Sequence, residues 1–369
     1  MRPIEMLASV TLLVTPAFSQ DTAELEAKID ALAAELEALQ LQDVMPVIGS
    51  SAYGLGPAAS KVYSKEQGFS IGGYGEGRYR QLEAGDEFDW YRHVMYFGYK
   101  FNDQWVLNTE IEVEHAEEVF VEFAYIDYLG LTENMNLRTG LMLSPMGLLN
   151  EYHEPTTFLT ANRSQTETVI LPTTWRENGV GVFGEKDGVD YKVYLLNGLD
   201  GDDFSTTSLR GGRQKGAVAR AEDFALVASV NYVDIPGVRI GGSIYSGDSG
   251  QDQGVGNMET DIFEVHAEYK SGPWWARALH ADASVTDRDA GDLDLNGTYC
   301  EVGYDLLSES DASLYPYVRY EEVETTGGDD ELTTLGLHYR PIDQLCFKLD
   351  QTTNSADEES CSFVIGYVF

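Results

Sequence analysis

Along most of this chain, hydrophobic and polar residues alternate one by one. Between Gly68 and Phe369 the alternation recurs in runs of about ten residues that end in Gly, Asn, Asp or Pro. One run divides into an apolar and a polar row: Trp105, Leu107, Ile111 and Val113 against Asn108, Glu110, Glu112 and Glu114. Successive side chains of a β-strand point to opposite faces, so the pattern predicts strands with one apolar and one polar face.

The number of these runs and the lengths of their connections predict the fold. We count sixteen strands: 69–82, 89–101, 104–114, 120–130, 135–144, 177–185, 188–197, 223–233, 237–246, 260–270, 274–285, 296–306, 313–323, 331–341, 344–352 and 361–369. Every second connection is short, whereas the others, such as 145–176, 198–222 and 324–330, are mostly longer and polar. Short turns on one side, long loops on the other and aromatic residues at strand ends are typical of transmembrane barrels. We therefore predict an all-β fold, a sixteen-stranded antiparallel transmembrane β-barrel over residues 68–369.

One connection, Pro145–Trp175, is about thirty residues long and has neither strand nor helix periodicity. Compact domains keep connections of this length mainly where they have a function. We predict that residues 145–176 fold into the lumen and constrict it. The charged candidates of this loop are Glu151, His153, Glu154, Arg163, Glu167 and Arg176. Arg163 and Arg176 are expected to anchor the loop to the wall and to border the pore.

Charged residues on the polar rows should line the lumen, because sixteen strands enclose a space too wide for side chains to fill. Alternation selects the following pore-lining residues: Arg78, Arg80, Arg92, Glu110, Glu112, Glu114, Arg138 and Arg319. A basic strip beside or across from an acidic one would create a transverse field that screens solutes. The alternative is that these are ordinary solvated residues without a role in selectivity.

The N-terminal part differs from the rest of the chain. Residues 1–19 have a positive start, an apolar core and small residues at a cleavage position, which predicts a signal peptide. Residues 20–42 carry an a/d seam of Leu25, Ile29, Leu32, Leu36 and Leu39, which predicts a coiled coil. An amphipathic helix lying on its own domain is the alternative. Residues 43–67, rich in Gly, Pro and Ser, are expected to be a linker.

Composition excludes several functions. The formal charge of −38 argues against a nucleic-acid partner, which would need a basic surface. We expect Cys300, Cys346 and Cys361 to be free, buried thiols, because the last two lie too far apart to bridge. No catalytic motif is present, so an enzyme is not expected. No cofactor or metal is expected either; calcium at the acidic runs Asp200–Asp203 and Asp287–Asp294 is the alternative, although neither run matches a calcium-loop pattern.

Two segments resemble a known family. The runs GLMLSPMGLLNEYHEPTTF (140–158) and ILPTTWRENGVGVFGE (170–185) are similar to the corresponding segment of the phosphate-selective porin O and P family. This resemblance implies a trimeric outer-membrane channel whose third long loop enters the lumen. The terminal Phe369 resembles the signal read by the barrel-insertion machinery. The chain departs from the family in having only nine lysines and in the row Glu110, Glu112, Glu114, so phosphate selectivity is not carried over.

The combined expectation is a porin for passive diffusion of small hydrophilic solutes and ions. It would be a homotrimer in the outer membrane of a Gram-negative bacterium, in contact with lipid and lipopolysaccharide, with its coiled coil in the periplasm. The acidity of the whole chain favours a mild cation preference, although lumen charge decides selectivity. Three alternatives remain open: an envelope tether that binds peptidoglycan, an outer-membrane lipid hydrolase, and a soluble β-sandwich.

Overall fold

The chain folds into a closed β-barrel that follows a separate N-terminal unit. The computed structural model describes residue 28 and residues 51–369 except 83, 255 and 290. Two compact units are formed, Met1–Met45 and Pro46–Phe369, and the barrel belongs to the second. The predicted signal peptide and coiled coil lie outside the described residues. No described helix is long and apolar enough to span a membrane.

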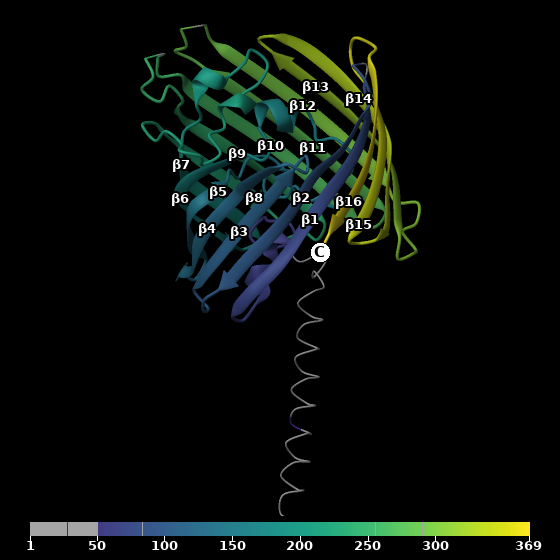
Figure 1. Cartoon of the computed structure of the whole chain (residues 1–369), viewed down its shortest axis with the longest axis horizontal. Helices are drawn as coiled ribbons and strands as arrows, with labels where there is room; N and C mark the ends of the chain where they lie inside the picture. Colours follow the sequence, from purple (N-terminus) through teal and green to yellow (C-terminus); the bar gives the residue numbers. More distant parts are fainter. Residues whose placement is uncertain (1–27, 29–50, 83, 255, 290) are drawn as a thin grey trace, which may run out of the picture. The chain divides into compact units, whose positions relative to one another are not determined.

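Sixteen antiparallel strands form the barrel, and each pairs with its neighbours in sequence (Figure 1). They are β1 (Gly68–Gln81), β2 (Glu87–Lys100), β3 (Trp105–Glu114), β4 (Glu118–Thr132), β5 (Met135–Leu143), β6 (Arg176–Lys186), β7 (Val189–Asn197), β8 (Phe224–Tyr232), β9 (Val238–Asp248), β10 (Glu259–Ser271), β11 (Trp274–Val285), β12 (Leu293–Tyr304), β13 (Ser313–Thr325), β14 (Gly328–Ile342), β15 (Leu345–Thr353) and β16 (Glu359–Val368). β1 pairs with β16, and Gly73 and Phe369 exchange two backbone hydrogen bonds of 2.9 and 2.8 Å at the seam. The predicted fold class is confirmed.

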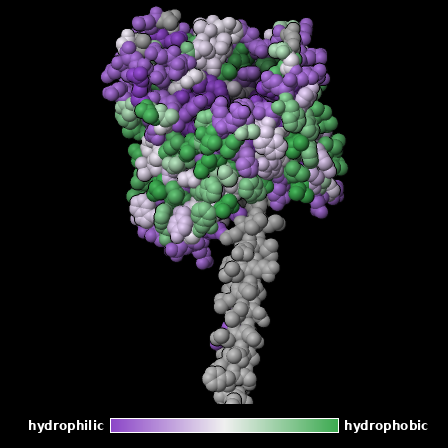
Figure 2. All heavy atoms as spheres, in the orientation of Figure 1, coloured by the Kyte–Doolittle hydropathy of each residue, from purple (hydrophilic) through white to green (hydrophobic). Residues whose placement is uncertain are grey.

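The outer face of the barrel is apolar. Large hydrophobic side chains on the outward rows remain exposed, for example Ile240, Ile244, Leu335 and Leu337. Figure 2 shows hydrophobic residues gathered over the middle of the visible barrel wall, with hydrophilic residues concentrated at the end that carries the long loops. Aromatic pairs stand at the short-turn ends of the strands: Tyr99 with Phe101, Trp105 with Tyr128, and Trp274 with Tyr304. An apolar band bordered by aromatic residues is what a barrel surrounded by lipid requires.

The connections differ most from the expectation between β13 and β14. The loop predicted over 324–330 is wrong, because β13 and β14 continue to Thr325 and Gly328 and only Thr326–Gly327 turn between them. Gly328 has φ of 141°, a conformation that favours glycine, and its carbonyl accepts a 2.6 Å hydrogen bond from the Thr325 hydroxyl. The long connections are therefore mainly 144–175, 198–223 and 249–258.

Local irregularities move some side chains from the face that strict alternation predicts. The register of β1 against β2 shifts between Glu76 and Arg78. Strict alternation places Tyr91 on the row opposite Arg92, but its ring stacks with the Arg78 guanidinium, 3.5 Å from the ring centre, on the lumen side. The three cysteines are free, as expected. The expectation that they are buried is correct only for Cys346. Cys300 is exposed and Cys361 is half-buried, because both lie on outward rows.

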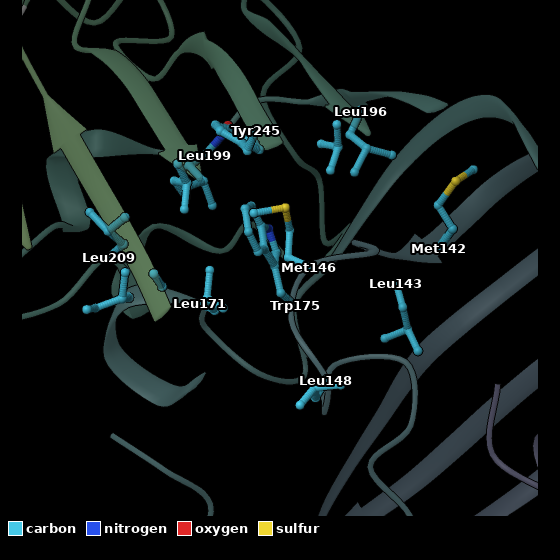
Figure 3. Close-up of a cluster of buried hydrophobic side chains, with 14 of the residues drawn as sticks. Met142, Leu143, Met146, Leu148, Leu171, Trp175, Leu196, Leu199, Leu209 and Tyr245 are labelled. Carbon is cyan, nitrogen blue, oxygen red and sulfur yellow. The ribbon is translucent and has the colours of Figure 1, made fainter. Parts of the chain in front are cut away.

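Two segments occupy the interior of the barrel. Residues 51–67, the described part of the expected linker, contain the 3₁₀ helix η1 (Ala59–Ser64), which packs against β1, β2 and β3. The loop 144–175, with η2 (Thr166–Ile170), reaches β11 and β12. Figure 3 shows a cluster in which Met146, Leu148, Leu171 and Trp175 of this loop meet side chains of the wall and of loop 198–223, among them Leu196, Leu199, Leu209 and Tyr245. These buried apolar contacts hold both loops inside the barrel.

Candidate pore constriction

The root of loop 144–175 is closed by one asparagine. The Asn150 side-chain amide donates to the carbonyls of Ser144 and Trp175 at 2.6 and 2.9 Å and accepts from the Trp175 N–H at 2.8 Å. Ser144 N–H also donates to the Trp175 carbonyl at 2.9 Å. Because the two ends of the loop are fastened together, the rest must project from a single point of the wall.

The far part of the loop is bound to the opposite wall. Arg319 of β13 donates to the Thr160 hydroxyl and the Asn162 carbonyl at 2.9 and 3.1 Å. Lys348 of β15 donates to the Thr160 carbonyl at 3.0 Å, and Asp350 accepts from Ala161 N–H at 2.8 Å. Glu167 accepts from Leu148 N–H, Leu149 N–H and the Tyr299 hydroxyl of β12. The loop therefore crosses the lumen from β5 and β6 to β12, β13 and β15.

The segment 51–67 is bound both to the loop and to the wall. Glu154 accepts hydrogen bonds from the backbone N–H groups of Ala58 and Ala59 at 2.9 and 3.2 Å. Burial is the main cause that raises the pKa of Glu154 to about 8. Arg138 of β5 forms two hydrogen bonds with the Asp127 carboxylate, at 2.8 and 2.9 Å, and a third with the Tyr63 hydroxyl at 3.0 Å. The predicted pore residue Arg138 therefore anchors this segment.

A water-accessible cavity of about 220 Å³ lies between the loop and the wall formed by β1, β2 and β16. Four arginines line it: Arg78 and Arg80 from β1, Arg163 from the loop and Arg210 from loop 198–223. Arg78 and Arg80 have carboxylate partners, Asp89 and Glu87, at 3.4 and 2.6 Å. Among the described residues, no carboxylate lies within ion-pair distance of Arg163 or Arg210. Glu76 is the carboxylate of the lining, and it pairs with Arg92 at 3.4 Å. Arginines therefore outnumber carboxylates around the cavity, and the excess charge is positive.

The loop 198–223 adds to this charge. Arg210 and Arg213 both donate to the Thr173 carbonyl at 2.7 Å, which places two guanidinium groups side by side. Desolvation, and after it the neighbouring Arg210 and Arg176, lowers the pKa of Arg213 to about 9. Mutual repulsion among buried arginines is relieved when an anion enters.

The acidic row belongs to a largely buried network that borders the cavity at Glu76. Arg92 of β2 lies 3.4 Å from Glu76, 3.4 Å from Glu112 and 3.6 Å from Glu114. Arg176, the first residue of β6, donates to Glu122 at 2.9 Å. Glu110 and Glu122 face His153 of the loop. Desolvation is the main cause that lowers the pKa of His153 to about 4, so its imidazole is neutral near pH 7.

The residues selected from the sequence thus fall into three groups. The first lines the cavity: Arg78, Arg80 and Arg163. The second forms the buried acidic network: Arg92, Glu110, Glu112, Glu114, His153 and Arg176. The third fastens the interior segments: Arg138, Glu154, Glu167, Arg319 and Glu151, which pairs with Lys192 of β7.

Arg210 of the cavity and its neighbour Arg213 were not selected from the sequence. Their signal is the run RGGRQK at 210–215, which places three basic residues within six positions of a very acidic chain. The acidic runs Asp200–Asp203 and Asp287–Asp294 bring no set of three metal-ligating groups together in the described part of the chain.

A closed sixteen-stranded barrel with a loop bound across its lumen defines the porin type of fold. Solved structures with this fold include OmpF of Salmonella typhi in complex with daunomycin (TM-score 0.57, 14% identity, 82% of this chain and 98% of that chain). An anion-selective porin of Comamonas acidovorans (0.56, 13%, 82% and 100%) and a trimer form of OmpT, an outer-membrane protein of Vibrio cholerae (0.54, 13%, 83% and 100%), are also similar.

The family of the chain is shown by a closer relative. An uncharacterized protein of Aquifex aeolicus (strain VF5) is 33% identical over 358 residues, which cover 85% of this chain and 81% of that protein. The chain belongs to the same family as this protein. No protein-family model matches the chain.

Proposed function

We propose that this protein is an outer-membrane porin through which small hydrophilic solutes diffuse passively, with a preference for anions. The observation that carries the proposal is the cavity between loop and wall, which is lined by Arg78, Arg80, Arg163 and Arg210. A loop bound across the lumen limits the size of the solute, and charge at the narrowest part of a pore selects its sign. The solved structures of this fold are outer-membrane proteins and porins, which supports a channel.

The overall acidity of the chain favours cations, whereas the constriction favours anions. Arg92 is the nearest cation to most of the acidic row Glu110, Glu112 and Glu114, and the first two of these residues are almost completely buried. Arg163, in contrast, has no carboxylate partner among the described residues. Because the local field at a constriction acts on the passing ion at close range, we assign selectivity to the arginines.

Planar-bilayer recording with a KCl gradient tests this function. We expect single-channel steps in groups of three and a reversal potential of the sign given by chloride selectivity. The variant R163Q/R210Q should move the reversal potential toward the potassium value. The control R220Q removes an arginine from the same loop as Arg210 that is largely exposed and lies outside the cavity, and it should behave as wild type. A folded barrel without channels would contradict the diffusion function, and a potassium-selective wild type would contradict the anion preference.

The assembly and location follow from the same proposal. The apolar outer face with its aromatic borders fits a barrel surrounded by outer-membrane lipid. A homotrimer is supported by the trimer form of the structurally similar OmpT. The predicted heptads of residues 20–42 would join three such chains in the periplasm, after removal of the signal peptide over residues 1–19. Contacts with lipopolysaccharide and peptidoglycan remain predictions.

A further inference from the structure

Three buried side chains at the root of the loop direct metal-ligating atoms toward one point. They are Glu110 of β3, Glu122 of β4 and His153 of the loop, and each contributes one ligand atom to a set that lies within 4.8 Å of one another. Their side chains are at most 2% exposed. Both carboxylate oxygens of Glu110, Oε2 of Glu122 and Nε2 of His153 have no hydrogen-bond partner among the residues that the structure describes. Buried polar atoms without a partner call for an explanation, and a water molecule or an ion that joins them is a common one.

The tautomer of His153 is fixed by its backbone contact. Its Nδ1 lies 2.7 Å from the Asn150 carbonyl oxygen, which can only accept, so Nδ1 carries the proton. The lone pair of Nε2 then points toward Glu110 Oε1 at 3.6 Å and Glu122 Oε2 at 3.4 Å. Electron-rich atoms thus face one another without a hydrogen between them. A backbone carbonyl on the second ring nitrogen is also the usual partner of a metal-ligating histidine.

The charge around this point is also negative in excess, which favours a bound cation. Glu110 and Glu122 face it, and Glu76, Glu112 and Glu114 belong to the same network as partners of Arg92. Within the described part of the chain, only the guanidinium groups of Arg92 and Arg176 form ion pairs with them. Uncompensated charge in a dry interior is strongly unfavourable, so a bound cation would stabilise the network.

The local backbone explains why two glutamates meet here. The register of β3 against β4 shifts between Glu110 and Ile111, so that Glu110 pairs with Phe123 and Ile111 with Val121. Glu122 lies at this bulge and turns inward beside Phe123, and both side chains are 1% exposed. The bulge therefore places the Glu122 carboxylate next to that of Glu110.

We propose that Glu110, Glu122 and His153 bind one divalent transition-metal ion of the zinc type. Two ligands at about 2.1 Å from a tetrahedral zinc ion are about 3.4 Å apart. The separations of 3.6 and 3.4 Å between Nε2 and the carboxylate oxygens of Glu110 and Glu122 are close to this value. An imidazole nitrogen with carboxylates suits zinc and its neighbours, whereas calcium and magnesium prefer oxygen ligands alone. The ion joins the root of the loop to the wall of β3 and β4.

Zinc binding by the full-length refolded protein tests the proposal. Protein stripped with a chelator is equilibrated with Zn²⁺ and separated by gel filtration, and its metal content is measured by mass spectrometry. We expect one zinc ion per chain in the wild type. E110Q, which keeps the shape of the side chain, and H153Q should each weaken binding by at least about tenfold. The matched control is H266Q, because His266 is a buried histidine whose two nitrogens already have partners, Glu264 and Asn231.

The visible absorption of bound Co²⁺ gives a second readout, which should be present in the wild type and H266Q and lost in E110Q. Heat-modifiable migration confirms that each variant is folded. Failure of the stripped wild type to bind zinc, or equal binding by wild type and E110Q, would overturn the proposal. The cluster would then be held by shared protons or by water. Channel activity does not enter this test, so its result is independent of the proposed transport function.

Discussion

At the scale of single residues, Glu154 makes the interior of the barrel sensitive to pH. Its carboxylate joins the loop to Ala58 and Ala59, and desolvation, the largest cause, raises its pKa to about 8. The folded chain therefore holds a proton between the ordinary pKa of about 4.5 and pH 8, where the unfolded chain has lost it. The contribution of the protonated Glu154 side chain to the free energy of unfolding is fully present below pH 4.5 and is lost as the pH rises through 8.

We expect E154Q to remove this dependence, because glutamine keeps an acceptor oxygen and does not ionise. Between pH 6.5 and 8, unfolding of the wild type relative to E154Q should become easier by up to about 1.4 kcal/mol per pH unit. His153, with its pKa of about 4, acts in the opposite direction but only below pH 6.5. Thermal unfolding in detergent across this range measures the difference. Parallel curves for both proteins would show that Glu154 does not titrate in this window.

Single residues also mark the limit of prediction from the sequence. Alternation correctly assigns Arg78, Glu110 and Arg319 to the lumen, because a regular strand fixes which face each side chain takes. It does not find the position of Tyr91, which strict alternation places on the row opposite Arg92, since a bulge shifts the register without any change in residue type. The partners of Arg319 lie more than 150 positions away in sequence, so its role as an anchor could not be read locally.

At the scale of elements, the loop 144–175 crosses the lumen, and two basic residues of the opposite wall bind its far end. Arg319 and Lys348 make three hydrogen bonds to Thr160 and Asn162. Hydrogen bonds from charged donors contribute about 1.5–3 kcal/mol each. The double variant R319Q/K348Q should release this end of the loop, raise the mean single-channel conductance and increase current noise.

The matched control for this experiment is R340Q. Arg340 also lies on a lumen-facing row, but it binds Asp343 in the exposed turn after β14 and does not hold the loop. Its conductance should equal that of the wild type. If R319Q/K348Q also conducts like the wild type, the remaining contacts keep the loop in place: the apolar cluster around Trp175 and Leu171 and the hydrogen bonds of Asp350 and Glu167.

The presence of the strands was predicted better than their end residues, and better than the segments that fill the barrel. Sixteen strands follow from the period of two and from the spacing of turns, whereas the strand ends differ by up to three residues, as at the starts of β12 and β14. Residues 51–67 resemble a linker by composition, yet Ala58, Ala59 and Val62 are buried against the inner wall. Small residues suit a linker and equally suit close packing inside a barrel, so composition does not separate the two cases.

At the scale of the whole molecule, the charge of −38 and the positive constriction act on a permeating ion over different distances. The long-loop end exposes many carboxylates, including Asp86, Asp202, Asp203, Asp252, Asp287 and Glu358. The Debye length is about 30 Å at 0.01 M salt and about 3 Å at 1 M. In dilute salt the exposed carboxylates therefore repel anions before they reach the arginines, whereas in concentrated salt only charges in direct contact with the ion still act.

We therefore expect the preference for anions to increase as the salt concentration rises. Reversal potentials measured at a constant concentration ratio, from about 0.01 to 1 M KCl, should move steadily toward the chloride value, the opposite of the trend for a pore with a single sign of charge. Neutralising Asp202 and Asp203 should reduce the change at low salt and leave the high-salt value unaltered, because these exposed residues are distant charges to an ion at the constriction. A preference for anions that weakens with added salt would mean that the loop carboxylates do not face the permeation path, and that the arginines alone determine which ions enter.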